Sequence, residues 1–280
     1  TSMGPLATGV YRAKFPYAYR APEGLSEEAA TAYFLQSIRD IFEEGTPADQ
    51  VAAIVVEPLQ GEGGFIPAPI AWVKALRALC DEHGILLVAD EVQSGFCRTG
   101  RMFASHYWAE AGAAPDILTT AKSIAAGLPL SAIVARSEIL DAVPTGTIGG
   151  TFCGNPLACA AALETIALME EQRLDVRAEE IGQIVRARCA KLQETYPVLG
   201  EVRGLGAMLG LEFVEDPATK APNGALVTKL VQECAQRGLL VENAGRWGQV
   251  LRFLAPLVIT DEQLQAGLDI LEEALAACVA

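Results

Sequence analysis

Ile85-Leu-Leu-Val-Ala89, followed at once by Asp90-Glu91, is the stretch that decides the fold of this 280-residue chain. Five apolar residues in a row are typical of a strand that is buried on both faces of a parallel sheet. Val51-Ala-Ala-Ile-Val-Val56 has the same apolar character, and Glu57-Pro58 ends it just as abruptly. Both runs therefore predict buried strands that end in a carboxylate.

The segments around these two runs alternate between helix and strand. Residues 70–83 repeat apolar side chains at helical spacing, and Gly84 provides the C-terminal stop of that helix. Ile117–Thr120 and Ser131–Ala135 are two further strand candidates. Strands that alternate with helices favour a parallel sheet with helices on both faces. The sequence therefore predicts an α/β fold with a mainly parallel sheet.

The C-terminal part of the chain has a different pattern. Asn155-Pro156 offers an N-cap and a proline at the first helical position, and Thr260 with Gln263 forms a capping box for the last helix. Between them, the pattern predicts helices near 156–170, 174–195 and 224–237 and strands near 202–214, 239–242 and 250–254. We therefore expect a large domain over residues 1–170 and a small C-terminal α+β domain over residues 171–280.

Composition and charge limit the class of protein. The sequence is 51% apolar and 20% charged, which is typical of a packed globular chain and argues against intrinsic disorder. With 21 basic against 35 acidic residues, the formal net charge is -14. Nucleic acids and anionic membranes attract clustered basic residues, so neither is an expected partner.

The cysteines and histidines give no sign of a metal site. The seven cysteines are scattered without any Cys-x-x-Cys pair, and there are only two histidines. Cysteines on apolar stretches are typical of core residues in a reducing compartment, so we expect a cytoplasmic protein. We expect neither a signal peptide nor a membrane span, because no apolar run has the required length.

Polar residues at the C-terminal ends of the predicted strands are candidates for a functional site, because ligands bind there in open parallel sheets. Lys122 follows the third strand among small and apolar residues. It is either a solvated surface lysine or an amine that forms a Schiff base with a carbonyl cofactor. Asp90 either caps the next helix or pairs with the protonated ring nitrogen of pyridoxal phosphate. The residues alone leave these alternatives open.

Three further features allow the same kind of choice. Gly149-Gly150-Thr151 presents backbone N–H groups and a hydroxyl that suit a phosphate, although glycine turns are usually only turns. The Gly61–Gly64 segment is also explained by turn chemistry alone. Arg252, inside the apolar run Val250–Leu254, needs a partner that is either a carboxylate of the protein or that of a substrate.

Together, these segments resemble the class III (ω-) aminotransferases, pyridoxal-phosphate enzymes of fold type I, and are most similar to 4-aminobutyrate aminotransferases. The motifs that carry the resemblance cover nearly the whole chain. They are Val55–Gly64 (VVEPLQGEGG), Leu87–Gly95 (LVADEVQSG), Arg98–Gly100 (RTG), Thr120–Ser123 (TAKS), Gly149–Pro156 (GGTFCGNP), Val202–Gly206 (VRGLG) and Leu251–Pro256 (LRFLAP). The resemblance implies an aspartate-aminotransferase-like large domain followed by a small domain.

The resemblance implies how pyridoxal phosphate would be held. Lys122 matches the lysine that forms the Schiff base and moves the proton between substrate and cofactor. Asp90 matches the partner of the ring nitrogen, Val92 the residue packed on one ring face, and Gln93 the residue bonded to the ring hydroxyl. Thr151 matches the threonine that reaches the phosphate in the neighbouring subunit, so the resemblance implies a homodimer or a dimer of dimers.

The resemblance also implies the substrates. Glu57 matches a glutamate beside the substrate amine. Glu62 and Arg252 match a gating pair: the glutamate neutralises the arginine for one substrate and moves away when the arginine binds the α-carboxylate of 2-oxoglutarate or glutamate. In the implied reaction, an ω-amino acid such as 4-aminobutyrate gives up its amine and leaves as succinate semialdehyde. The amine passes to 2-oxoglutarate, which becomes glutamate.

Some elements that the resemblance implies are not found in this sequence. The family's phosphate loop, the aromatic residue stacked on the cofactor ring and the arginine for the distal substrate carboxylate lie upstream of the first motif. We therefore expect the N-terminal part of the enzyme, with two strands of its sheet, to be missing from this chain.

Other functions stay open at this point. A different class III aminotransferase would act on ornithine, acetylornithine, lysine, 5-aminovalerate or diaminobutyrate, and a racemase would use the same scaffold. A truncated, non-catalytic chain would act only as an interaction partner. A nucleotide-binding sheet protein is disfavoured, because no Gly-x-Gly-x-x-Gly turn follows a strand.

Overall fold

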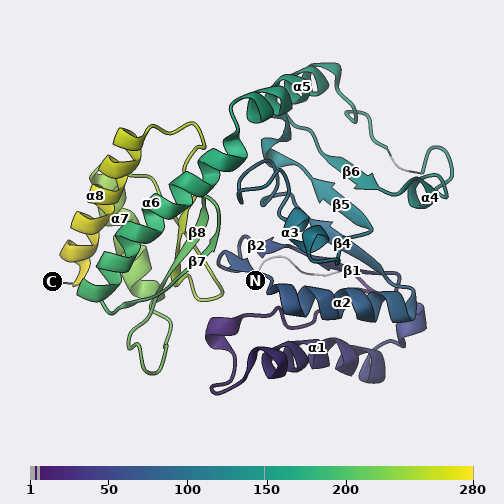
Figure 1. Cartoon of the computed structure of the whole chain (residues 1–280), viewed down its shortest axis with the longest axis horizontal. Coiled ribbons are helices and arrows are strands. Elements are labelled where there is room, and N and C mark those ends of the chain that lie inside the picture. Colours follow the sequence, from purple (N-terminus) through teal and green to yellow (C-terminus); the bar gives the residue numbers. More distant parts are fainter. Residues whose placement is uncertain (1–3, 5–6, 148, 280) are drawn as a thin grey trace.

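The computed structural model of the chain describes residues 4, 7–147 and 149–279 and contains two four-stranded sheets (Figure 1). The first sheet has the order β1-β4-β5-β6, and β1, β4 and β5 are parallel. Its strands are β1 (Ala53–Val56), β4 (Leu86–Asp90), β5 (Ile117–Thr120) and β6 (Ala132–Ala135). The predicted α/β class with a mainly parallel sheet is confirmed.

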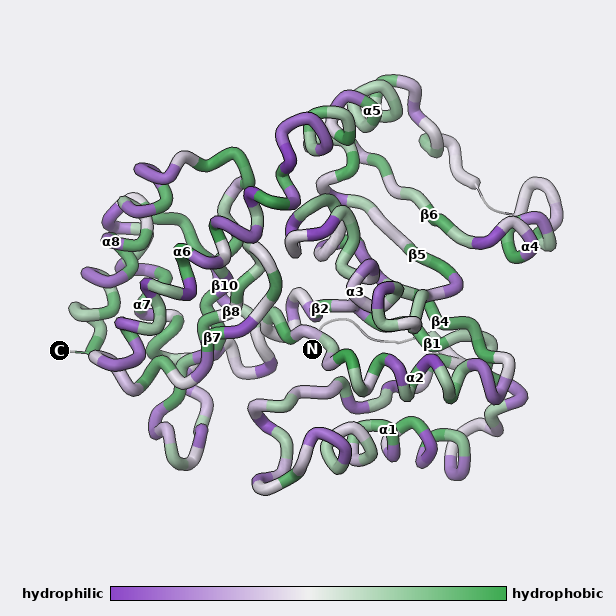
Figure 2. The backbone as a smooth tube through the Cα atoms, in the orientation of Figure 1, coloured by the Kyte–Doolittle hydropathy of each residue, from purple (hydrophilic) through white to green (hydrophobic). Residues whose placement is uncertain are grey.

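Helices pack on the apolar face of this sheet. α1 (Glu27–Glu44) lies beside α2 (Ile70–His83), and α3 (Ser105–Glu110) packs against α2. Alternate residues of β1 and β4 point into the buried cluster that these helices enclose, and Figure 2 shows how hydrophobic these strands are. The cluster includes Phe34, Leu35, Ile38, Trp72, Val73, Leu76, Leu87, Ala89 and Trp108. On the opposite face of β1, Val55 is 64% exposed.

β6 differs from the prediction, because it runs antiparallel to β5. Residues 121–131 connect the two strands and contain only the short 3-10 helix η3 (Lys122–Ala125). A parallel neighbour needs a crossover of a dozen or more residues, usually with an α-helix that covers one face. The short connection therefore returns the chain as an antiparallel strand at the edge of the sheet.

The second sheet is antiparallel throughout and has the order β7-β8-β10-β9. Its strands are β7 (Leu199–Leu205), β8 (Met208–Phe213), β9 (Glu242–Ala244) and β10 (Val250–Phe253). The sequence pattern predicts one strand over residues 202–214, but Gly206, with a φ of +49°, turns the chain and makes a hairpin of β7 and β8. Every residue of β8 is buried, which makes this strand the centre of the C-terminal core.

Three helices pack on the second sheet and enclose an apolar cluster with it (Figure 1). They are α6 (Leu174–Thr195), α7 (Gly224–Gln236) and α8 (Asp261–Val279). The predicted capping box starts α8: the Gln263 N–H donates to Thr260 Oγ1 and the Thr260 N–H donates to Gln263 Oε1, both at 3.2 Å. None of the helices in the described ranges combines the length and apolar character that spanning a membrane requires.

Shorter elements join these parts. The Gly61–Gly64 turn lies between β2 and β3, which pair with each other. α5 begins at the predicted cap, because Asn155 Oδ1 accepts from the N–H groups of Leu157 and Ala158 at 3.0 and 3.3 Å. The remaining elements of the chain are η1 (Ala18–Arg20), η2 (Ala48–Gln50), β2 (Leu59–Gln60), β3 (Ile66–Pro67), α4 (Ser137–Leu140) and the longer helix α5 (Pro156–Glu171).

The chain bends where the predicted domain boundary lies. Between α5 and α6, Arg173 has a φ of +49°, so the two helices do not continue into each other. The first sheet precedes this bend and the second sheet follows it. The division into residues 1–170 and 171–280 stays a prediction. One contact crosses this boundary, because Arg20, from the first part, donates a hydrogen bond to Glu212 of the second sheet.

α6 approaches the β7–β8 turn so closely that only glycine fits at position 182. A Cβ atom on Gly182 would lie 2.2 Å from the carbonyl oxygen of Gly206. We expect Gly182→Ala to lower the free energy of unfolding by about 1–3 kcal/mol, because the helix and the turn must move apart. The midpoint of chemical unfolding measures this loss.

Gly267→Ala, on α8, is the matched control. A Cβ atom there would meet only Leu239 Cδ1 at 3.5 Å, an ordinary contact. Since alanine is the better helix former, this variant should gain roughly 0.5–1 kcal/mol. A higher free energy of unfolding in both variants would contradict the close approach of α6 to the turn.

Candidate active site

The first sheet brings Glu57, Asp90 and Lys122 to one edge. β1, β4 and β5 are neighbours and parallel, with Val56 opposite Ala89 and Asp90 opposite Thr119. Glu57 follows β1, Asp90 ends β4, and Lys122 begins η3 just after β5. The charges of Asp90 and Lys122 are close enough to change the pKa of Glu57. Three of the predicted site residues therefore lie together at the C-terminal edge of the sheet.

Burial dominates the electrostatics of Glu57. Desolvation raises the pKa of this carboxyl above its ordinary value of 4.5, and the negative charges of Asp90 and Glu62 act in the same direction. The positive charge of Lys122 and a hydrogen bond from the Gly61 N–H, which donates to Glu57 Oε2 at 2.8 Å, oppose this rise in the pKa. The site therefore favours a protonated Glu57 more than water does.

The raised pKa of Glu57 predicts a pH dependence of stability. Between the ordinary and the raised pKa, the folded chain binds more protons than the unfolded chain. This contribution to stability is therefore complete below the ordinary pKa and is lost as the pH rises through the folded pKa. Glu57→Gln keeps an acceptor for the Gly61 N–H without the titration, so we expect its stability relative to the wild type to rise as the pH passes between the two pKa values and to stay higher above them.

Urea unfolding from about pH 4 to about pH 8 measures the effect. The difference between the unfolding midpoints of the variant and the wild type should be small at the acidic end and grow with pH. Glu215→Gln, an exposed position in the turn after β8, is the control for the loss of one surface charge. Two pH profiles that run parallel would contradict the assignment of the titration to Glu57.

The turn after β4 positions Asp90, Val92 and Gln93. The Val92 N–H donates to Asp90 Oδ1 at 3.1 Å, so Asp90 caps this turn rather than a regular helix. Gln93 lies over Gly61, where a Cβ atom would come within 1.7 Å of Gln93 Oε1. Gln93 Oε1 is buried and has no hydrogen-bond partner among the described residues. A buried acceptor without a partner is rare, so it marks a place for a donor from a ligand.

Lys122 has an unusual backbone conformation. Its φ is +46°, which is in the left-handed region, and Ala126 at the end of η3 has a φ of +48°. Residues other than glycine adopt this region at a cost of about 1–2 kcal/mol. α5 packs against η3 and holds it in place. Strained backbone of this kind gathers at functional sites, and here it accompanies an exposed lysine at the strand ends.

The structure also shows a residue that the sequence pattern did not single out. Glu91 is completely buried, and its carboxylate accepts from Ser94 Oγ at 2.6 Å and from the N–H groups of Ala104 and Ser105 at 3.1 and 2.5 Å. These bonds tie the turn after Asp90 to the start of α3. The adjacent acids of the Asp90-Glu91 pair thus have different tasks, and Glu91 holds the turn that carries Val92 and Gln93.

Glu62 and Arg252 are in contact. Arg252 Nη1 lies 2.6 Å from Glu62 Oε1, and Arg252 Nη2 lies 2.6 Å from Glu242 Oε2. The arginine side chain is 12% exposed, while both glutamates lie mostly in solvent. In this structure the partners of Arg252 are therefore carboxylates of the protein itself, and a role of the pair as a gate stays a prediction.

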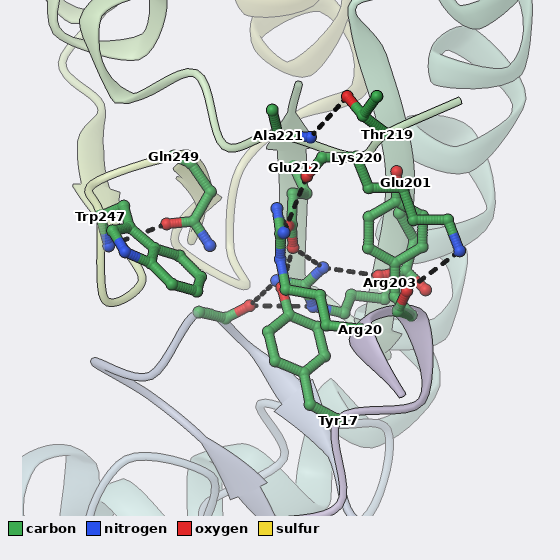
Figure 3. Close-up of polar contacts among 12 residues, drawn as sticks. Tyr17, Arg20, Glu201, Arg203, Glu212, Thr219, Lys220, Ala221, Trp247 and Gln249 are labelled. Atoms are coloured by element: carbon green, nitrogen blue, oxygen red, sulfur yellow. Dashed lines mark hydrogen bonds and ion pairs between the residues drawn. The ribbon is translucent and has the colours of Figure 1, made fainter. Parts of the chain in front are cut away.

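Two backbone contacts hold the loop that carries Glu62 on the second sheet. Arg203, on β7, donates from Nε and Nη2 to the Gly64 carbonyl oxygen at 3.0 and 2.6 Å. The Gly245 N–H donates to the Glu62 carbonyl oxygen at 2.9 Å. Figure 3 shows the polar cluster behind this loop, in which Arg203 also reaches Glu212 of β8. The backbone of the loop is fixed, so the side chain of Glu62 is the part that can move.

Thr151 has no side-chain bond to these residues. It is exposed, in the turn before α5, and its side chain makes no hydrogen bond with the described residues. Its neighbour Phe152 is 86% exposed. No hydrogen bond between described residues joins the side chain of Thr151 to Glu57, Asp90 or Lys122, and its predicted contact with a neighbouring subunit stays a prediction.

Comparison with known proteins gives a consistent result. The family model described as aminotransferase class-III matches residues 1–275. A probable 4-aminobutyrate aminotransferase of Bacillus subtilis and a 5-aminovalerate aminotransferase of Pseudomonas putida are each 44% identical over 98% of this chain. The chain spans 62% of the length of each of these relatives.

Solved structures show the same similarity in three dimensions. A PLP-bound amine transaminase from an uncultivated Pseudomonas species has a TM-score of 0.90 at 35% identity, covering 99% of this chain and 64% of that one. An ω-transaminase from Thermomicrobium roseum has a TM-score of 0.89 at 32% identity, over 100% of this chain and 62% of that one. The family model, the relatives and the fold agree: the chain belongs to the class III aminotransferases.

Proposed function

We propose that the chain carries out pyridoxal-phosphate-dependent transamination of an ω-amino acid, 4-aminobutyrate, with 2-oxoglutarate, giving succinate semialdehyde and glutamate. The observation that carries the proposal is that Glu57, Asp90 and Lys122 meet at three adjacent strand ends. The contact between Glu62 and Arg252 supports a site for carboxylate substrates. The names of the similar proteins from Bacillus subtilis and Pseudomonas putida support an ω-amino acid as donor.

The residues of the site fit the cofactor. Gln93 Oε1, which is buried and has no partner among the residues that the structure describes, would accept from the ring hydroxyl, and Asp90 would face the ring nitrogen. Val92 would pack on one face of the ring, and Lys122 would hold the aldehyde carbon. When bound, pyridoxal phosphate supplies an electron sink for the negative charge that forms on the substrate carbon. Asp90, Val92 and Gln93 are partly buried, and Lys122 is exposed at the same edge of the sheet, where the aldehyde could reach it.

The side chains of the chain then handle charges and protons. With pyridoxal phosphate bound, the amine of Lys122 would accept the proton that leaves the substrate carbon and would deliver it to the cofactor carbon that carried the aldehyde, as general base and then general acid. Asp90, at the end of β4, would pair with the protonated ring nitrogen. Glu57 lies beside the position of the substrate amine, and Arg252 binds the α-carboxylate of the oxo acid once Glu62 has moved away.

Steady-state kinetics with a panel of donors tests this proposal. With added pyridoxal phosphate and 2-oxoglutarate, we expect the highest kcat/KM for 4-aminobutyrate. A higher value for 5-aminovalerate would favour the second candidate, which the Pseudomonas putida relative supports. Ornithine, acetylornithine, lysine and diaminobutyrate complete the panel. No glutamate formation with any donor would favour a non-catalytic chain.

We also propose a homodimer or a dimer of dimers, in which Thr151 reaches the phosphate of the neighbouring site. Large exposed apolar side chains that follow Thr151 in the sequence support it, because exposed apolar surface is common at interfaces. They are Phe152, Leu157 and Leu163, which are 86%, 75% and 71% exposed. Light scattering after size exclusion tests the assembly: a monomer would contradict it.

A cytoplasmic location completes the proposal. All seven cysteines are free thiols, and Cys80, Cys97, Cys189 and Cys234 are buried as core residues. Free cysteines are typical of proteins in a reducing compartment. Fractionation of cells that make the protein, with activity measured in each fraction, tests the location.

A further inference from the structure

Arg252 has a second carboxylate partner that no motif in the sequence suggests. Glu242, on β9, lies directly opposite Arg252 on β10 in the antiparallel register. Side chains of residues directly opposite each other point to the same face of a sheet. The contact between Arg252 Nη2 and Glu242 Oε2, at 2.6 Å, is therefore fixed by strand pairing.

The two carboxylates differ in what holds them. Glu62 lies on the turn between β2 and β3, and its side chain is 79% exposed. It can leave Arg252 by rotation of its side chain alone. Glu242 is also exposed, but its backbone belongs to β9 and pairs with the strand of the arginine. Strand pairing therefore keeps Glu242 directly opposite Arg252 and on the same face of the sheet, so its charge remains near the arginine when Glu62 moves away.

The other neighbour of Arg252 leaves space on this side of the sheet. Arg252 pairs with Gly210 of β8, where a Cβ atom would lie 2.9 Å from the Gly64 carbonyl oxygen. The absence of a side chain at position 210 lets the loop that carries Glu62 approach the arginine. Arg252 is thus flanked by one carboxylate from a loop and one from its paired strand, and its Nε is buried without a partner in the described part of the chain.

We propose that Glu242 is a permanent counter-ion of Arg252 that weakens the binding of dicarboxylate oxo acids and so sets their KM; this rests on the proposed function. When Glu62 leaves, Nη1 is free for the α-carboxylate of the oxo acid, while Nη2 remains bound to Glu242. The negative charge of Glu242 repels the incoming carboxylate across a few ångströms. A donor that carries no carboxylate at this position does not meet this repulsion, so Glu242 acts on one half of the reaction only.

Glu242→Gln tests the proposal, since glutamine keeps an acceptor for Nη2 but not the charge. We expect the KM for 2-oxoglutarate to fall about threefold to tenfold at low salt, with kcat and the KM for 4-aminobutyrate unchanged. The difference should shrink as salt is added, because the glutamate is exposed. Glu242→Asp, which keeps the charge, should retain a KM near that of the wild type. Glu215→Gln, which removes an exposed charge away from Arg252, should do the same.

A second measurement does not depend on turnover. Glutarate has both carboxylates of 2-oxoglutarate but no reactive oxo group, and its binding raises the unfolding temperature. We expect a larger glutarate-induced shift in Glu242→Gln than in the wild type, and no shift in Arg252→Ala. A merely structural role of Glu242 would instead loosen the arginine, which would raise the KM and reduce the shift.

The outcomes separate this proposal from the proposed function. Turnover in all variants with an unchanged or higher KM for 2-oxoglutarate in Glu242→Gln would overturn the role of Glu242 alone. No turnover in any variant would overturn the proposed function. The shift of the unfolding temperature with glutarate would then test the role of Glu242 by itself. Tighter glutarate binding in Glu242→Gln would still support the counter-ion, whereas equal binding, or none in any variant, would overturn it.

Discussion

Lys122→Ala should abolish transamination, with a loss of at least about 10³-fold in kcat. The amine of Lys122 is the group we assign both to the bond with the cofactor and to the proton transfer, and no other lysine follows a strand of the first sheet within the described residues. Glutamate formation measures the loss. The visible absorption of the protein with added pyridoxal phosphate should also lack the band that depends on a covalent lysine.

Two controls make this result specific. Lys122→Arg keeps the positive charge but offers no amine for a Schiff base, so it should be as inactive as the alanine variant. Lys191→Ala removes an exposed lysine from α6 and should leave kcat unchanged. Wild-type turnover in Lys122→Ala would remove Lys122 from its assigned role.

Arg252→Ala should raise the KM for 2-oxoglutarate by roughly 10- to 100-fold, because charge-assisted hydrogen bonds to a carboxylate contribute about 1.5–3 kcal/mol. The KM for 4-aminobutyrate should change much less, since the donor half does not use the arginine when Glu62 neutralises it. Initial rates over a matrix of both substrate concentrations separate the two KM values. An equal rise in both would show a general loss of the site.

The stability of Arg252→Ala is a useful check. The two glutamates that it leaves are 79% and 77% exposed, so no charge is buried without a partner and the unfolding midpoint should change little. Arg246→Ala removes a nearby exposed arginine that lies over Trp247, 5.5 Å from the ring centroid. This control should leave the KM for 2-oxoglutarate unchanged.

Regular, well-capped elements could be predicted from the sequence, because their signals are local. The helix expected over 174–195 is α6, and the helix expected over 70–83 is α2, which ends at Gly84 with a φ of +68°. Periodic apolar residues and terminal caps specify such helices without long-range contacts. The strand predicted at 239–242 is displaced to β9, and Leu240 is 88% exposed. Pairing with β10 determines which residues form β9, and the apolar run in the sequence does not show that pairing.

The part of the candidate site in which polar residues end buried strands could be predicted from the sequence. The part that depends on which residues of neighbouring strands lie opposite each other could not. Glu57, Asp90 and Lys122 lie together because three strand ends share one edge. The contact of Glu242 with Arg252 depends on the register of β9 and β10, and no spacing in the sequence encodes it. The antiparallel direction of β6 follows from the length of one connection, and the sequence pattern of a strand has no direction.

The polar cluster behind the Glu62 loop has a consequence for how the chain folds during synthesis. Tyr17 and Arg20 both hydrogen-bond to Glu212, which is 195 and 192 residues further along (Figure 3). At roughly 5–20 residues per second, a ribosome needs about 10–40 seconds to make that intervening chain. Contacts of such long sequence separation also form late, because the loop between them must close first. During synthesis, the segment around Tyr17 and Arg20 therefore stays undocked from the second sheet, and accessible to proteases, until that sheet has emerged from the ribosome.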